Sequence, residues 1–239
     1  MFRTENIHFR KTNKNTVVKK VREVYLRRDI PCLSSQCLLD PPCHQRVKID
    51  SSLLSHEPYY YLIPDYSVVL RYKELLEQEE LTNIIFTETI LQRLQTEDKT
   101  RTYKTLRQVA KDPRRRSIVF SNEHCEDGCV LREPEETIDH RDWRALVQTA
   151  NWYRQHLSGS VPIILLSEKF TQEDRSIPHG ENGITVMSLK EYLNEFWPWS
   201  VVLHELLNSL KEAILEEDLE LQSQGTVLSR KSGTTGYEE

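Results

Sequence analysis

Three carboxylates stand at positions where this chain could carry out hydrolytic chemistry. Asp65 ends a short apolar run, Glu168 follows another, and Asp142 lies near the start of a strongly amphipathic segment. Because the carboxyl ends of parallel strands meet at one edge of a sheet, these side chains can converge there. Carboxylate clusters bind Mg²⁺ or Mn²⁺, which activate water for phosphodiester cleavage. The pattern therefore indicates a metal-dependent site.

A second set of reactive residues lies closer to the N-terminus. Cys32, Cys37, Cys43 and His44 fall within thirteen residues, in a loop that also contains two prolines. Thiolate and imidazole are the ligands that zinc prefers, so a zinc site is one interpretation, and a loop with free thiols is the other. Cys125 and Cys129 could complete a site only if the fold brought them close. The odd total of five cysteines argues against a secreted disulfide framework.

A third set is basic and follows an expected helix over residues 103–111 and its exit: Lys104, Arg107, Lys111, Arg114, Arg115 and Arg116. These residues form either a solvated face or a surface for RNA phosphates. The same alternatives apply to the basic segment 1–30. The whole chain has a formal net charge of −5 and a pI of about 6.0, so nucleic-acid binding would have to come from such local patches.

The elements that position these residues alternate between strand and helix. The apolar runs predict strands at residues 59–64, 84–86, 117–121, 161–166 and 184–187. Helices are expected at residues 68–80, 88–95, 103–111, 139–157, 189–196 and 201–221, with Asp139 as the N-cap of the fourth. This alternation predicts an α/β fold, with a parallel sheet of about five strands and helices on both faces.

The 239 residues suffice for one large domain with extensions. We expect a basic, cysteine-containing extension over residues 1–57, the α/β domain over 58–221 and a linker over 222–239. The chain start carries charges where a signal peptide would be apolar, and no run approaches the ~18 apolar residues of a membrane span. These features predict a soluble protein of a reducing compartment, with no membrane partner.

Several short stretches resemble the N-terminal PIN domain of the exosome-associated exoribonucleases of the RNase II/R (RNB) family. They are Val21-Arg22-Glu23-Val24-Tyr25-Leu26-Arg27, the cysteine triplet, Tyr61-Leu62-Ile63-Pro64-Asp65, Thr89-Ile90-Leu91-Gln92, Phe120-Ser121-Asn122-Glu123, Arg141-Asp142-Trp143-Arg144-Ala145, Ala150-Asn151-Trp152-Tyr153 and Tyr237-Glu238-Glu239. The resemblance covers roughly residues 17–220. Ile63-Pro64-Asp65-Tyr66, Phe196-Trp197-Pro198 and His204-Glu205-Leu206 look most like the cytoplasmic, Dis-three-like branch of the family.

The resemblance implies a PIN-like (Rossmann-like) fold and a metal held by four acidic positions. Three of these positions match Asp65, Asp142 and Glu168, but the fourth reads Arg93 in this chain. Arg93 would repel the metal, or fill its place by pairing with Asp65, and the longer Glu168 would fit octahedral Mg²⁺ poorly. We therefore expect a degenerate, inactive nuclease site.

The resemblance also implies partners. The family is one of 3'-5' exoribonucleases, and this module would dock onto core ring subunits of the RNA exosome during cytoplasmic mRNA decay. The family's RNB exonuclease domain is not found in the 239 residues, so we expect a fragment or a short isoform. Two alternatives stay open: a weak Mn²⁺-dependent endoribonuclease using Asp65, Asp142 and Glu168, and a non-cleaving RNA-binding module.

Overall fold

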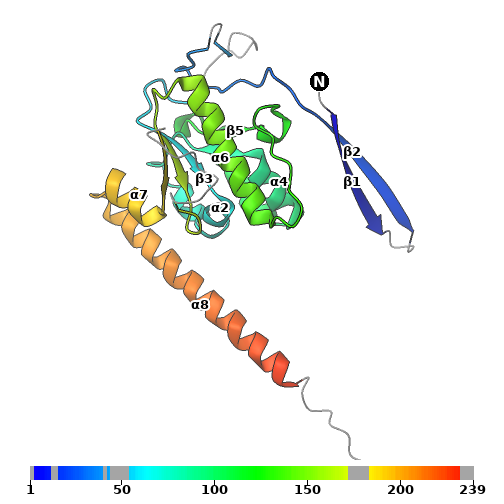
Figure 1. Ribbon diagram of the computed structural model, residues 1–239. Helices are drawn as coiled ribbons and strands as arrows, with labels where there is room; N and C mark the ends of the chain where they lie inside the picture. The colour runs from blue at the N-terminus through cyan, green and yellow to red at the C-terminus, as the bar shows by residue number, and fades with distance from the viewer. Residues whose placement is uncertain (1–2, 12–15, 40–41, 44–53, 172–182, 232–239) are drawn as a thin grey trace, which may run out of the picture. The chain divides into compact units, whose positions relative to one another are not determined.

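The structure is a computed structural model that describes residues 3–11, 16–39, 42–43, 54–171 and 183–231 (Figure 1). The chain forms two compact units, Met1–Ser188 and Leu189–Glu239. The predicted boundary of the α/β domain at residue 221 therefore lies within the second unit. His44 lies outside the described residues.

Five parallel strands form the centre of the first unit. They are β3 (Tyr61–Pro64), β4 (Ile85–Thr87), β5 (Ile118–Phe120), β6 (Ile163–Leu166) and β7 (Ile184–Met187). A three-stranded sheet has the order β3-β6-β7, and a two-stranded sheet pairs β4 with β5. An isolated parallel bridge between Leu62 and Ile84 places β4 beside β3. The predicted sheet of about five strands is thus present as three plus two strands.

The order of these strands explains where a site can form. β3 is the first of the five in the chain, and its neighbours are β4 on one side and β6 on the other. The chain therefore reverses its direction of winding at β3, and the crevice beyond the carboxyl end of such a strand is where ligands bind in α/β sheets. β3, β4 and β6 are buried throughout, as their continuous apolar runs predict. Asp65 follows β3 directly.

Helices surround the strands of this unit (Figure 1). They are α2 (Tyr66–Arg71), α3 (Lys73–Leu76), α4 (Glu88–Thr96), α5 (Thr100–Lys111) and α6 (Ile138–Leu157). The single helix expected over residues 68–80 is interrupted at Tyr72, whose backbone angles of −124° and 30° lie outside the helical range. Buried residues of α6 include Trp143 and Tyr153, and the Tyr153 ring packs edge-on against Tyr61 of β3.

The start of α6 differs from the prediction. The N-cap is Thr137, whose hydroxyl accepts a hydrogen bond of 3.2 Å from the backbone N–H of His140. Asp139 was the wrong choice of cap, because it lies inside the first helical turn. Its carboxylate is therefore available for contacts with other elements.

The N-terminal segment forms a hairpin in which β1 (Arg3–Lys11) pairs antiparallel with β2 (Val17–Tyr25). The second unit contains α7 (Leu189–Phe196) and α8 (Val201–Lys231). The carbonyl oxygen of Trp197, in the turn between them, lies 3.2 Å from Nε2 of His204 in α8. α8 extends to Lys231, into the segment predicted to be a linker. None of the described helices is long and apolar enough to cross a membrane.

Candidate functional site

A pocket of about 210 Å³ lies at the carboxyl end of β3, and we call it the carboxylate pocket. Its walls come from α2, α4, α6 and the segment after β6. The lining residues are Asp65, Tyr66, Ser67, Leu70, Arg71, Arg93, Asp139, Asp142, Trp143, Leu146, Lys169 and Phe170. Two of the predicted acids, Asp65 and Asp142, meet here as expected, together with Arg93.

Asp65 is buried, and its carboxylate is surrounded by hydrogen-bond donors. One oxygen accepts from the Ser67 hydroxyl at 2.7 Å and from the backbone N–H of Val68 at 2.8 Å, which caps α2. The other accepts from the Ser167 hydroxyl at 2.5 Å. Burial raises the pKa of Asp65, although these hydrogen bonds act in the opposite direction.

Arg93 projects from α4 and pairs with three carboxylates. Its guanidinium donates to Asp139 at 2.8 Å, to Asp142 at 3.1 Å and to Glu97 at 2.8 Å. The guanidinium carbon also lies 3.7 Å from the ring centroid of Tyr66. Burial alone would lower the pKa of Arg93, but the hydrogen bonds to the three carboxylates raise it overall.

The predicted pairing of Arg93 with Asp65 is therefore wrong. The hydrogen bonds of the Asp65 carboxylate are made to the start of α2 and to Ser167. Arg93 instead contacts two carboxylates on successive turns of α6. Asp139 and Asp142 are three residues apart, so both side chains project from one face of that helix.

Asp142 lies between two guanidinium groups. Its side chain is 8% exposed, and Arg141 lies 3.3 Å from one oxygen while Arg93 lies 3.1 Å from the other. Burial raises the pKa of Asp142, and both arginines oppose that shift. Asp139 in turn accepts a hydrogen bond from the Lys169 ammonium, which is the main reason that its pKa is lowered. Both α6 carboxylates are thus already neutralised by cations of the protein.

Glu168, the third predicted acid, is exposed and does not line the carboxylate pocket. Its neighbour Ser167 is buried and bonds to Asp65 instead. The sequence reasoning missed Asp139, Ser167 and Lys169. The i, i+3 spacing of Asp139 and Asp142 could have revealed the first, whereas no sequence pattern marks the other two.

The residues of the carboxylate pocket do not fit a divalent cation. Mg²⁺ requires near-octahedral oxygen ligands at about 2.0–2.1 Å. In the described part of the chain, one group of three or more potential metal ligands has its ligand atoms within 4.8 Å of one another. That group contains no carboxylate. Arg93 and Lys169 bind the oxygens that such an ion would need.

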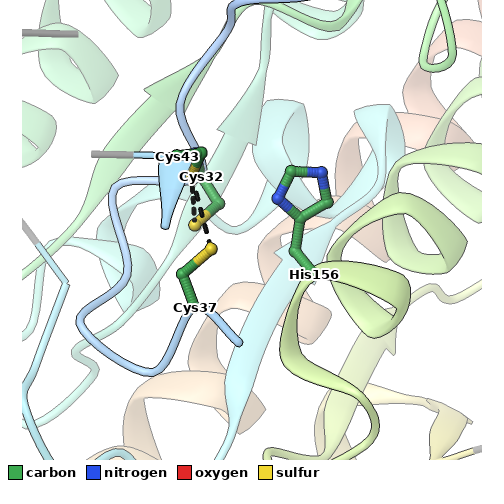
Figure 2. Close-up of side chains that lie close together, drawn as sticks. All are labelled: Cys32, Cys37, Cys43 and His156. Carbon is green, nitrogen blue, oxygen red and sulfur yellow. Dashed lines mark hydrogen bonds between the residues drawn. The ribbon is translucent and has the colours of Figure 1, made fainter. Parts of the chain in front are cut away.

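That one group is formed by Cys32, Cys37, Cys43 and His156, and we call it the cysteine–histidine cluster (Figure 2). The Cys43 sulfur lies 3.2 Å from that of Cys32 and 3.6 Å from that of Cys37. The hydrogen bond with Cys32, together with contacts to His156 and Cys37, outweighs the effect of burial and lowers the pKa of the Cys43 thiol to about 3. Three sulfurs and one imidazole are a ligand set typical of tetrahedral zinc.

His156 comes from the last turn of α6, far from the cysteines in sequence. Its ring lies 3.6 Å, between centroids, from that of Trp152. The sequence predicted His44 as the fourth ligand because it adjoins Cys43, and His156 was missed because no local spacing connects it to the cysteines.

The cysteine segment is also tied to the body of the first unit by hydrogen bonds. The Tyr153 hydroxyl donates to the Cys32 carbonyl at 3.1 Å, and the backbone N–H of Leu38 donates to the His156 carbonyl at 2.9 Å. The Ser34 and Tyr61 hydroxyls lie 2.6 Å apart. A metal in the cluster would therefore fix the segment against α6.

The predicted RNA-contacting residues divide into two groups. Five are exposed: Lys104, Arg107, Lys111, Arg114 and Arg116. Arg115 is buried, and its guanidinium donates to the carbonyls of Leu76, Glu77 and Leu81 at 2.6–2.8 Å. The assignment of Arg115 to an RNA surface was therefore wrong, because this side chain links α3 to the segments that follow it.

Comparison with known structures defines the class of fold. No protein-family model matches the chain. The solved structure of the T. brucei RRP44 PIN domain has a TM-score of 0.57 and 23% sequence identity, and the match covers 75% of this chain and 99% of that one. The first unit, with its parallel sheet and flanking helices, has the fold of a PIN domain.

Sequence comparison narrows the class. The chain is 30% identical over 227 residues to the exosome complex exonuclease dis3 of Schizosaccharomyces pombe, covering 88% of this chain and 22% of the relative. It is 28% identical over 231 residues to the human exosome complex exonuclease RRP44, covering 92% and 23%. The chain is therefore related to the N-terminal PIN domain of Dis3-like exonucleases, as the resemblance predicted. It spans less than a quarter of the length of these relatives.

Proposed function

We propose that this PIN domain is a catalytically degenerate module of an exosome-associated 3'-5' exoribonuclease. In this proposal it docks onto the core ring of the RNA exosome during cytoplasmic mRNA decay. The names of the relatives support the association, since both are exosome complex exonucleases.

The observation that carries the proposed degeneracy is the position of Arg93. Its guanidinium lies within hydrogen-bonding distance of Asp139 and Asp142. Two unit charges about 4 Å apart interact by about 4 kcal/mol at an effective dielectric constant of 20. A divalent cation entering the carboxylate pocket would have to overcome that repulsion and replace Arg93. This cost favours a degenerate module over the alternative Mn²⁺-dependent endoribonuclease.

Cleavage of a circular single-stranded RNA tests the degeneracy, because a circle has no end for a contaminating exonuclease. We expect no cleavage by the natural chain in Mn²⁺, and the same result for Asp65→Asn. Cleavage by the natural chain that disappears in Asp65→Asn would establish the endoribonuclease instead.

We further propose that the cysteine–histidine cluster binds zinc through Cys32, Cys37, Cys43 and His156. The support is the S₃N ligand set, in which three buried cysteines and a half-buried histidine place their ligand atoms within 4.8 Å of one another. Zinc content per chain, measured after purification without chelator, is expected to be one in the natural chain. His156→Ala should lower it strongly, and His44→Ala serves as the matched control. If His44→Ala lost its zinc and His156→Ala kept it, the fourth ligand would be His44.

Docking is proposed to depend on the cysteine segment and not on the carboxylate pocket. Co-purification with the exosome core ring should survive Arg93→Ala and fail when Cys32, Cys37 and Cys43 are replaced by Ser. A cooperative unfolding transition in the triple variant would show that the body still folds. Full binding by this folded, zinc-free variant would remove the cysteine segment from the docking surface.

A further inference from the structure

The outer face of α5 carries three cations in one stripe. Thr102, Leu106 and Val109 are the buried residues of this helix, so they define its inner face. At about 100° per residue, Lys104, Arg107 and Lys111 all lie within about 60° of one another on the opposite side. They are spread over roughly two helical turns, or ~10 Å along the axis. We call these three residues the α5 basic face.

These cations have no anionic partner in the described part of the chain. No carboxylate there lies within ion-pair distance of Lys104, Arg107 or Lys111, and α5 itself contains no acidic residue. Two exposed arginines elsewhere are paired, Arg27 with Asp29 at 2.8 Å and Arg28 with Glu126 at 2.6 Å. An uncompensated basic stripe on a chain of net charge −5 is an electrostatic feature suited to an anionic ligand.

The rest of this face indicates which kind of anion would bind. Protein interfaces depend on buried aromatic or apolar anchors, with charges at the rim. No large exposed apolar residue of the described chain lies on α5. Affinity for a nucleic-acid backbone, in contrast, comes from Lys and Arg that replace counterions, and it requires no apolar anchor.

We propose that the α5 basic face binds the phosphodiester backbone of RNA, without sequence preference and away from the carboxylate pocket. None of its three residues lines that pocket. Arg115 does not take part, since its guanidinium is buried, and Arg114 is already paired with Asp112 at 2.8 Å. The module would therefore hold RNA on its surface without cleaving it, in addition to the proposed docking function.

Fluorescence anisotropy with a labelled single-stranded 20-nucleotide RNA, at several salt concentrations and without added divalent cations, tests this proposal. The test variant replaces Lys104, Arg107 and Lys111 by Gln. The matched control replaces Arg114, Arg132 and Lys190 by Gln, which removes the same charge from outside the α5 basic face. Because all six side chains are exposed, the thermal unfolding of both variants should match that of the natural chain.

We expect the test variant to bind RNA about tenfold or more weakly at low salt, with the control much closer to the natural chain. The slope of log K against log salt should fall in magnitude by about 2, because the variant loses three phosphate contacts and each contributes ~0.7 to the slope for a single strand. No RNA binding by the natural chain, or an equal loss in the control, would overturn the proposal. So would equally effective competition by polyglutamate at matched charge, which would indicate an acidic protein partner.

Discussion

Replacing Arg93 by Ala should destabilise the first unit by an amount that depends mainly on one ion pair. Glu97 and Asp139 are 37% and 38% exposed, and such exposed pairs contribute about 0–1 kcal/mol. Asp142 is 8% exposed, and breaking a buried pair costs about 3–5 kcal/mol. Because Arg141 stays 3.3 Å from Asp142, we expect about half of that, or ~2 kcal/mol.

Urea unfolding followed by tryptophan fluorescence measures this change. At ~2 kcal/mol, the melting temperature of a unit of this size should fall by about 4–8 °C. Mn²⁺ should restore stability to Arg93→Ala and more strongly to Arg93→Glu, because the vacated position lies between carboxylates. A ligand at 100 times its Kd contributes about 2.7 kcal/mol. The natural chain should show no such Mn²⁺ effect.

Arg114→Ala is the matched control, since it removes an arginine whose partners Asp112 and Glu79 lie at the surface. Its stability should change little. The reasoning about Arg93 would be refuted if both variants were equally stable. It would also be refuted if Mn²⁺ stabilised the natural chain and this effect disappeared in Asp65→Asn.

Three further predictions concern buried or capping residues. Burial raises the pKa of Asp65, so the native protein binds a proton at this carboxylate more readily than the unfolded chain does. The stability that this protonation provides is lost as the pH rises through the pKa of Asp65 in the native protein. Asp65→Asn, which keeps the cap acceptor for α2, should therefore be more stable than the natural chain at pH 7, with the difference disappearing near pH 3 in urea titrations. Arg115→Met should lower the free energy of unfolding by about 3 kcal/mol, because three carbonyls lose their donor. The affinity for RNA should stay unchanged, and weaker RNA binding by the folded variant would contradict the structural role of Arg115. Thr137→Ala should cost about 1 kcal/mol as the loss of an N-cap, and an unchanged unfolding midpoint would remove that role.

The sequence by itself was sufficient to predict the α/β fold and the place of Asp65 at the carboxyl end of a buried strand. Strands such as β3 and β6 are continuous apolar runs, and a parallel sheet buries such runs on both faces. Asp65 directly follows one of them, so chain order and strand direction together place it at the carboxyl edge. These features depend on local pattern and on general rules of topology, which a single sequence carries.

The tertiary structure alone decided which side chains meet. The partners of Arg93 on α6, the approach of His156 to the cysteines and the burial of Arg115 all join elements far apart in the chain. Helical periodicity shows which face a residue occupies, but not which element packs against that face. Asp65 was therefore located correctly and given the wrong partner, since the direction of a buried carboxylate depends on the donors that packing brings to it.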